Sequence, residues 1–98
     1  TSVTSTAACR EAGYIVDAGV GVPARPALAA DYYRLGCSRR DGLSCVRLAT
    51  LQSLGRGVPR DADAALDVLD PACASGLQEA CFRLGLHLSA TGVAADRR

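Results

Sequence analysis

The stretch Cys37-Ser-Arg-Arg-Asp-Gly-Leu-Ser-Cys45 is matched 36 residues later by Cys73-Ala-Ser-Gly-Leu-Gln-Glu-Ala-Cys81, so two cysteine pairs share one internal spacing. Cys9 lies 36 residues before Cys45 and keeps the same register. A fixed period of about 20–50 residues is typical of solenoids, in which each repeat is one supersecondary unit that stacks on the next. The cysteines therefore predict a repeat protein.

The repeat extends beyond the cysteines. Four residues after Cys9, Cys45 and Cys81 comes a small residue, and further along comes a turn rich in glycine and proline. The small residues are Gly13, Ala49 and Gly85, and the turns read Gly-Val-Gly-Val-Pro at 19–23 and Gly-Arg-Gly-Val-Pro at 55–59. A third turn, Thr-Gly-Val-Ala-Ala at 91–95, matches after one deletion, and Ala-Ala-Asp-Tyr-Tyr at 29–33 falls on Ala-Leu-Asp-Val-Leu at 65–69.

The periodicity predicts two kinds of helix. The first kind, called A-type here, is expected at about residues 7–18, 43–54 and 79–90. In the second copy Cys45, Leu48, Ala49 and Gln52 share one face, and the small residue there lets a neighbouring backbone approach closely. Each A-type helix is followed by a glycine, which accepts the left-handed conformation found at helix C-termini.

The second kind, called B-type, is expected at about residues 25–38 and 61–75. Asp61 suits the N-cap of the second B-type helix with Asp63 in its first turn, and Pro26 suits the first turn of the other. Pro71 falls inside the second helix, so we expect a kink and one lost hydrogen bond there, with Gly76 ending the helix.

Composition limits the class of protein. The 98 residues are 49% apolar with only three Tyr and one Phe, so alanine and leucine carry the core, as suits closely packed helices. A net charge of +1 gives no electrostatic footprint for nucleic acid, and no apolar run is long enough to span a membrane. We expect a polar lead-in at residues 1–6 and one domain at 7–98.

The repeat resembles the Sel1-like repeat, a relative of the tetratricopeptide repeat, over about residues 7–96. The resemblance implies an all-α, right-handed α-solenoid of antiparallel helix pairs in the order A-B-A-B-A, about two and a half repeats, stapled by disulfides. The second copy carries the family pattern at Leu48, Gly55, Gly57, Val58, Asp61, Ala65, Leu69, Ala72 and Gly76. The first copy carries it at Ala8, Gly13, Gly19, Gly21, Val22, Ala29, Tyr32 and Tyr33, and the third at Ala80, Leu84 and Gly85.

The cysteine spacing resembles a cysteine-rich, secreted branch of this family known from the Helicobacter cysteine-rich proteins. Departures from the family pattern are Val16, Gln52 and Leu88 in place of an aromatic residue, and Arg25 where the second copy has Asp61.

We expect disulfides between Cys37 and Cys45 and between Cys73 and Cys81. Each pair places one thiol at the end of a B-type helix and one at the start of the next A-type helix, and such adjoining ends meet within disulfide distance. High cysteine density without C-x-x-C favours an oxidising compartment. The alternative is a metal site, but structural zinc usually requires closer cysteine spacing.

Cys9 has no partner in this register, because the corresponding position 1 is threonine. It is interpreted either as a buried free thiol, as a thiol bonded to sequence upstream, or as the site of an intermolecular disulfide.

No catalytic, cofactor-binding or metal-binding residues are predicted. The chain has no lysine, which excludes Ser-x-x-Lys pairs, phosphate-loop lysines and Schiff bases. The single histidine, His87, corresponds to Leu51 and Ile15 in the other copies, so a packing or interface role is favoured. Family resemblance alone implies an alternative, a cell-wall-related penicillin-binding or β-lactamase-like role.

A partner-binding strip is predicted on the A-type helices, opposite the cysteine-bearing face. In stacked repeats such a strip lines the inner surface, although these side chains could instead be buried against adjacent helices. Arg47 and Arg83 could orient an acidic partner or be ordinary surface charge. The candidate residues are Tyr14, Ile15, Arg47, Thr50, Leu51, Leu54, Arg83, Leu86 and His87.

The resulting hypothesis is a non-catalytic scaffold of a bacterial envelope or extracellular assembly, periplasmic or secreted. Its expected partners are other protein subunits, with no nucleic acid, no small-molecule substrate and no cofactor. The helix order leaves the last A-type helix uncovered, so either further chain or a partner is expected to cover it. A cytosolic regulator with reduced thiols is a third reading, which a thiol count would distinguish.

Overall fold

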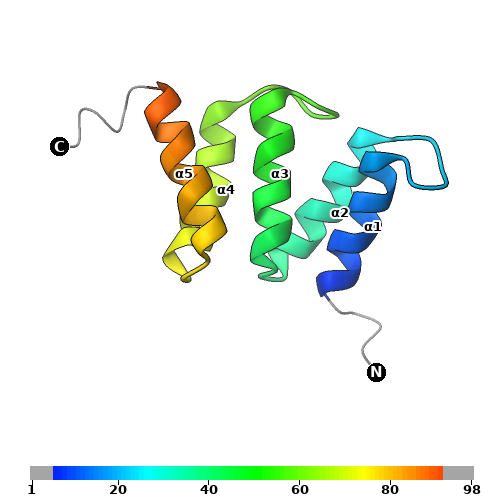
Figure 1. Cartoon of the computed structure of the whole chain (residues 1–98), viewed down its shortest axis with the longest axis horizontal. Helices are drawn as coiled ribbons and strands as arrows, with labels where there is room; N and C mark the ends of the chain where they lie inside the picture. The colour runs from blue at the N-terminus through cyan, green and yellow to red at the C-terminus, as the bar shows by residue number, and fades with distance from the viewer. Residues whose placement is uncertain (1–5, 92–98) are drawn as a thin grey trace.

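The computed structural model describes residues 6–91, and five α-helices with no strand make up this part of the chain. The A-type helices are α1 (Thr6–Ala18), α3 (Gly42–Leu54) and α5 (Gln78–Thr91), and the B-type helices are α2 (Pro26–Ser38) and α4 (Ala62–Ala74). They stand side by side in a row with short turns between them (Figure 1). The predicted all-α repeat architecture is confirmed.

The helix bounds agree with the prediction to within one residue at each end. The lead-in expected at 1–6 and the third turn at 91–95 lie outside the described residues, except that Thr6 begins α1 and Thr91 ends α5. α4 continues through Pro71, whose carbonyl accepts a hydrogen bond from the amide of Ser75 at 3.0 Å.

Helix ends are fixed by the residues that local rules favour. The Asp61 carboxylate accepts from the Ala64 amide at 3.0 Å, and Asp41 caps α3 by accepting from the Ser44 amide at 3.1 Å. Gly55 ends α3 with φ 70°, a left-handed conformation that a side chain would disfavour.

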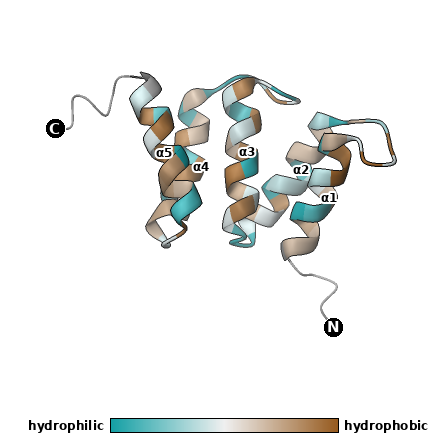
Figure 2. Ribbon diagram, in the orientation of Figure 1, coloured by the Kyte–Doolittle hydropathy of each residue, from teal (hydrophilic) through white to brown (hydrophobic). Residues whose placement is uncertain are grey.

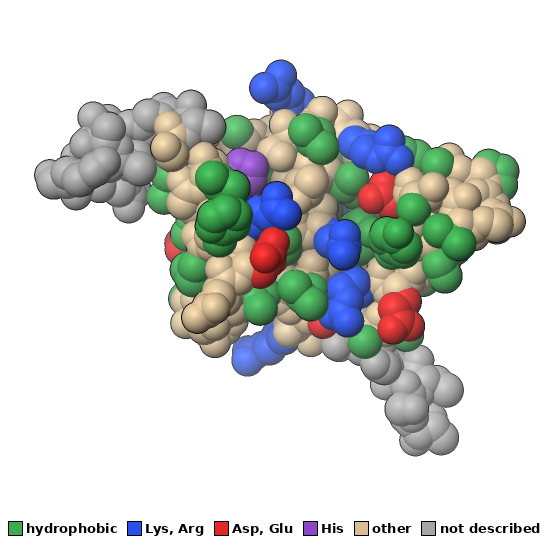
Figure 3. Space-filling view, viewed as in Figure 1, with side chains coloured by type: hydrophobic (Ala, Val, Ile, Leu, Met, Phe, Trp, Pro, Cys, Tyr) green, Lys and Arg blue, Asp and Glu red, His purple; other side chains and the backbone are tan. Residues whose placement is uncertain are grey.

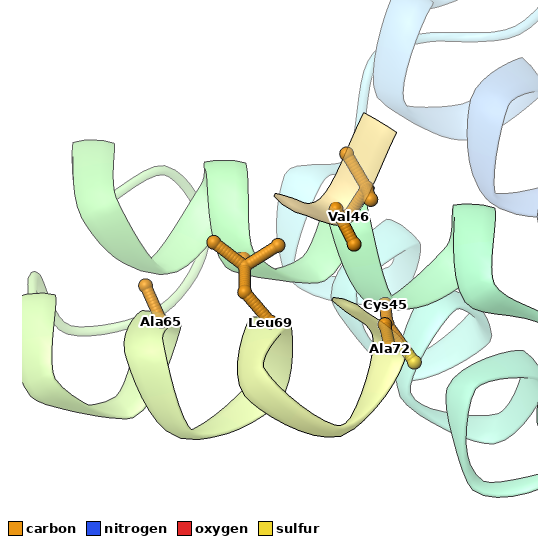
Figure 4. Close-up of a cluster of buried hydrophobic side chains, with 7 residues drawn as sticks. Cys45, Val46, Ala65, Leu69 and Ala72 are labelled. Atoms are coloured by element: carbon orange, nitrogen blue, oxygen red, sulfur yellow. The ribbon is translucent and has the colours of Figure 1, made fainter. Parts of the chain in front are cut away.

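The core consists of two adjoining groups of mostly small side chains. One lies between α3, α4 and α5, where Leu69 of α4 points toward α3 (Figure 4). The other joins α2 to α3 around Tyr33, Leu48 and Leu51. α3 carries both hydrophobic and hydrophilic residues along its length (Figure 2), and six of its residues are buried, as suits the central helix of the row.

Glycine permits two close approaches that hold the row together. A Cβ at Gly13 would lie 2.5 Å from the ring of Tyr33, so α1 and α2 meet through this ring. A Cβ at Gly57 would lie 2.4 Å from the backbone of Pro26, because the second turn packs directly on the start of α2. These contacts explain why the repeat requires small residues at such positions.

Both B-to-A turns are closed by disulfides. Cys37 bonds to Cys45 with the Cα atoms 4.6 Å apart, and Cys73 bonds to Cys81 with the Cα atoms 4.5 Å apart. Within residues 6–91 Cys9 is bonded to no other cysteine, and it is half-buried. The cross-links therefore occur at equivalent places in successive repeats.

Gly13 and Gly85 occupy equivalent places with opposite surroundings, which gives a matched test of the packing. Gly13→Ala forces a methyl group into the buried Tyr33 ring, whereas nothing in the described part of the chain lies within 4 Å of a Cβ at Gly85. Both variants gain helix propensity of about 1 kcal/mol. We therefore expect Gly85→Ala to be more stable than Gly13→Ala by about 1–3 kcal/mol, the usual cost of overpacking. Urea unfolding measures this, and equal stabilities would contradict the packing described.

The disulfides are expected to carry much of the stability. Closing a loop of this length stabilises a protein by roughly 2–3 kcal/mol on the chain-entropy model, so Cys73→Ser/Cys81→Ser should lose about that amount in urea unfolding. Cys9→Ser is the control and should change little. Titration of the unfolded, unreduced wild-type protein should find one thiol, whereas five would mean that the cross-links do not form in the protein.

Candidate functional site

The exposed surface of α1, α3 and α5, called the A-helix face here, contains the candidate residues. α1 contacts α3 and α3 contacts α5, whereas α2 and α4 approach each other much less. The A-type helices therefore pack against one another more closely than the B-type helices do. Figure 3 shows basic side chains near the middle of the viewed face, with apolar side chains to either side.

Most of the predicted strip is accessible. Arg47 and four apolar residues are exposed, and Thr50, Arg83 and His87 are half-buried. The four apolar residues are Tyr14, Ile15, Leu54 and Leu86. The structure thus places these predicted residues on one layer and leaves their binding role as a prediction.

Leu51 is a correction to the prediction. Its side chain is only 3% exposed and packs in the core group of Ala29, Ala30, Tyr33 and Leu48. The repeat register equates it with Ile15, which is 42% exposed. The difference arises because α3 is the central A-type helix and has neighbours on both sides, so Leu51 forms the floor of the face rather than its surface.

Two shallow grooves cross the A-helix face and share Arg47. The central groove, of about 260 Å³, lies between α3 and α5 and reaches the end of α1; it is lined by Asp17, Leu43, Val46, Arg47, Thr50, Leu51, Glu79 and Arg83. The N-terminal groove, of about 420 Å³, lies between α1 and α3; it is lined by Arg10, Glu11, Tyr14, Ile15 and Arg47. Arg47 therefore stands at their junction.

The arginines that line these grooves differ in whether a carboxylate neutralises them. Arg10 donates to both carboxylate oxygens of Asp41 at 2.8 and 2.9 Å, and Arg83 donates to Glu79 at 3.0 Å. Arg47 instead lies over the ring of Tyr14, 5.7 Å from its centroid, a cation–π distance. Within residues 6–91, Arg47 is the groove arginine without a carboxylate partner.

Two ion pairs that join the repeats were not predicted from the sequence. Arg10 reaches from α1 to the N-cap Asp41 of α3, and Arg56 of the second turn donates to the carboxylate of Asp17 at 2.9 Å and to its backbone carbonyl at 2.8 Å. The repeat register gave no signal for them, because Arg10 corresponds to Val46 and Phe82 in the other copies. They fix the relative positions of α1 and α3 and hence the shape of the grooves.

Phe82 is an exposed apolar residue that the prediction missed. It is 63% exposed, whereas its equivalent Val46 is 6% exposed in the core group between α3, α4 and α5. No described helix follows α5 to cover it. The repeat register alone points to a buried position, because it aligns Phe82 with Val46 on the core face of the central helix.

A third groove, of about 530 Å³, lies away from the candidate strip. It is bordered by the Cys37–Cys45 disulfide and by α4 residues including Asp67, Val68 and Pro71. It contains none of the predicted binding residues, so we assign it no role.

The Tyr33 hydroxyl is buried beneath the A-helix face without a hydrogen-bond partner in the described part of the chain. Burial raises the pKa of this phenol above its ordinary value, and the negative charge of Asp17 raises it further, while Arg47 acts in the opposite direction. An unpaired buried hydroxyl costs about 1–3 kcal/mol, so this group destabilises the fold.

Within the described residues, no three His, Cys, Asp or Glu side chains are grouped so that they could hold a metal ion. No described helix is both long and apolar enough to cross a bilayer.

No protein-family model matches the sequence, and no curated protein matches it significantly. Solved structures are similar to it. Cysteine-rich protein B of Helicobacter pylori is 31% identical with a TM-score of 0.77, over 83% of this chain and 61% of that one. A protective antigen of uropathogenic Escherichia coli with an SLR fold is 29% identical with a TM-score of 0.81, over 89% of this chain and 19% of that one.

A Sel1 repeat protein from Oxalobacter formigenes is 22% identical with a TM-score of 0.82, over 90% of this chain and 36% of that one, which shows likeness of fold alone. The chain thus spans less than two thirds of the length of each of these proteins.

Tyr33→Phe tests the buried hydroxyl. We expect the variant to be as stable as the wild type at neutral pH, or more stable by up to about 1 kcal/mol, because it removes an unpaired polar group. Since the folded-state pKa of Tyr33 is raised, wild-type stability should fall as pH rises above about 10, where only the unfolded chain releases the proton.

The variant should lose less stability over that alkaline range than the wild type. Urea unfolding at neutral pH and at about pH 10–11 measures both effects, with Tyr14→Phe as the control for an exposed ring. A neutral-pH loss above about 1 kcal/mol in Tyr33→Phe would mean that the hydroxyl does have a partner.

Proposed function

This chain is a Sel1-like repeat protein, and from that premise we propose that it is a non-catalytic scaffold that binds another protein on its A-helix face. Its partners are protein subunits of a bacterial envelope or extracellular assembly. The observation that carries the proposal is the set of exposed apolar side chains on α1, α3 and α5, interspersed with arginine on a rigid layer of helices. Aromatic residues and arginine are the types enriched in protein interfaces.

The rigidity of the face supports binding at modest entropic cost. Disulfides close both B-to-A turns, and the ion pairs Arg10–Asp41 and Arg56–Asp17 join the first repeat to the second. Because the backbone of such a scaffold is already ordered, it loses little conformational entropy when a partner binds, and more of the contact energy remains as affinity.

The disulfides also support an extracytoplasmic location. Cross-links of this kind persist in the periplasm or outside the cell, and cytosolic thiols are kept reduced. A periplasmic or secreted position is therefore part of the proposal. The alternative of a penicillin-binding or β-lactamase-like enzyme has only the family resemblance in its favour, and no feature of the described residues adds to it.

Ile15 and Leu35 provide a matched test. Both are aliphatic and 42% exposed, but Ile15 is on the A-helix face and Leu35 is on α2. We expect Ile15→Asp to reduce capture of a partner from bacterial envelope extract by about tenfold or more, as loss of an interface anchor does, and Leu35→Asp to leave it unchanged. Quantitative mass spectrometry of the captured proteins, relative to empty matrix, measures this.

Circular dichroism is the control that checks whether both variants fold. The proposal fails if wild-type protein enriches nothing over the matrix, or if Leu35→Asp abolishes capture while Ile15→Asp retains it.

A further inference from the structure

We propose that Arg47 anchors a carboxylate of the partner, namely an Asp or Glu side chain next to an apolar side chain in an extended segment that lies along the two grooves. This inference rests on the proposed function and specifies the chemistry of the partner. It follows from the charge that Arg47 leaves unpaired, from its place between the grooves, and from the side chains around it.

The guanidinium of Arg47 is held in position, but none of its donors is hydrogen-bonded in the part of the chain that the structure describes. Its Cζ lies over the ring of Tyr14, 5.7 Å from the centroid, in a cation–π contact that uses none of its hydrogen-bond donors. The five N–H donors lie in the guanidinium plane and remain available at its edge, in the fork arrangement that matches a carboxylate. Tyr14 therefore orients Arg47 and leaves its hydrogen-bonding capacity to a ligand.

The surrounding charges favour one carboxylate rather than a polyanion. Arg10 and Arg83 in the same grooves are paired with Asp41 and Glu79, so they offer little net charge. A phosphate backbone requires several free cations along its path, and among the described residues the two grooves supply one, Arg47. Glu11 lines the N-terminal groove without an ion pair in the described chain, and would repel a second acidic group on that side.

Apolar side chains border the anchor on both sides. Leu43, exposed at the start of α3, lines the central groove, and Ile15 lines the N-terminal groove. A segment whose carboxylate meets Arg47 would place its neighbouring side chains against these two residues. An acidic residue next to an aliphatic or aromatic one is thus the pattern that satisfies the charge and buries apolar surface together.

Selection from a randomised nonapeptide library displayed on phage tests the inference. Against wild-type protein we expect enrichment of Asp or Glu beside an apolar residue. Against Arg47→Gln the acidic preference should disappear while the apolar preference remains. Arg34→Gln, which alters an exposed arginine on α2, is the control and should select the same peptides as the wild type.

The most enriched peptide and its Glu→Gln or Asp→Asn counterpart then give a double-mutant cycle by fluorescence anisotropy. The amide peptide should bind wild-type protein about fivefold to tenfold more weakly, and Arg47→Gln should bind both peptides equally. A selection without acidic enrichment, a selection that yields no binder, or an acidic preference that persists in Arg47→Gln overturns the inference.

These failures are distinct from failure of the proposed function. Peptides that bind without an acidic preference, and that Ile15→Asp no longer binds, would leave the A-helix face as the interaction surface and remove only the anchor.

Discussion

The disulfide at each turn from a B-type to an A-type helix is the constraint on which the rest of the structure depends. The core beneath is small, because six of its twelve buried hydrophobic residues are alanine, and within residues 6–91 the large apolar side chains that are completely buried are Tyr33 and Leu69. A small core supplies little hydrophobic stabilisation to offset chain entropy. Cross-links that act on the unfolded chain compensate for this, and they also tie the first turns of α3 and α5 to the ends of the preceding B-type helices.

Equivalent positions in the repeat have different environments, and this difference produces the surface. Val46 is buried on the central helix, whereas Phe82 on α5 is exposed, and Gly13 touches the Tyr33 ring while Gly85 has open space beside it in the described structure. Each repeat therefore presents the same kind of packing surface. The number of neighbouring helices decides whether that surface is buried inside the protein or available to another molecule.

Polar contacts join the first repeat to the second, in addition to the apolar core. Asp41 caps α3 and also binds Arg10, so one carboxylate both starts a helix and joins two repeats. Asp17 and Arg56 make a similar link at the opposite ends of α1 and α3. Arg10, Arg56 and Arg83 are paired with carboxylates, whereas Arg47 contacts the Tyr14 ring and no carboxylate within residues 6–91.

The sequence by itself determined the fold class, the five helices, the N-cap Asp61 and the cysteine pairs, because these follow from local periodicity and from a 36-residue repeat that aligns equivalent residues. It also indicated which layer carries exposed apolar residues. Only the tertiary structure decided that Leu51 is buried, that Phe82 is exposed, and which arginines are neutralised. Burial and ion pairing depend on neighbours distant in the chain, such as Asp41 for Arg10, and the repeat register does not contain this information.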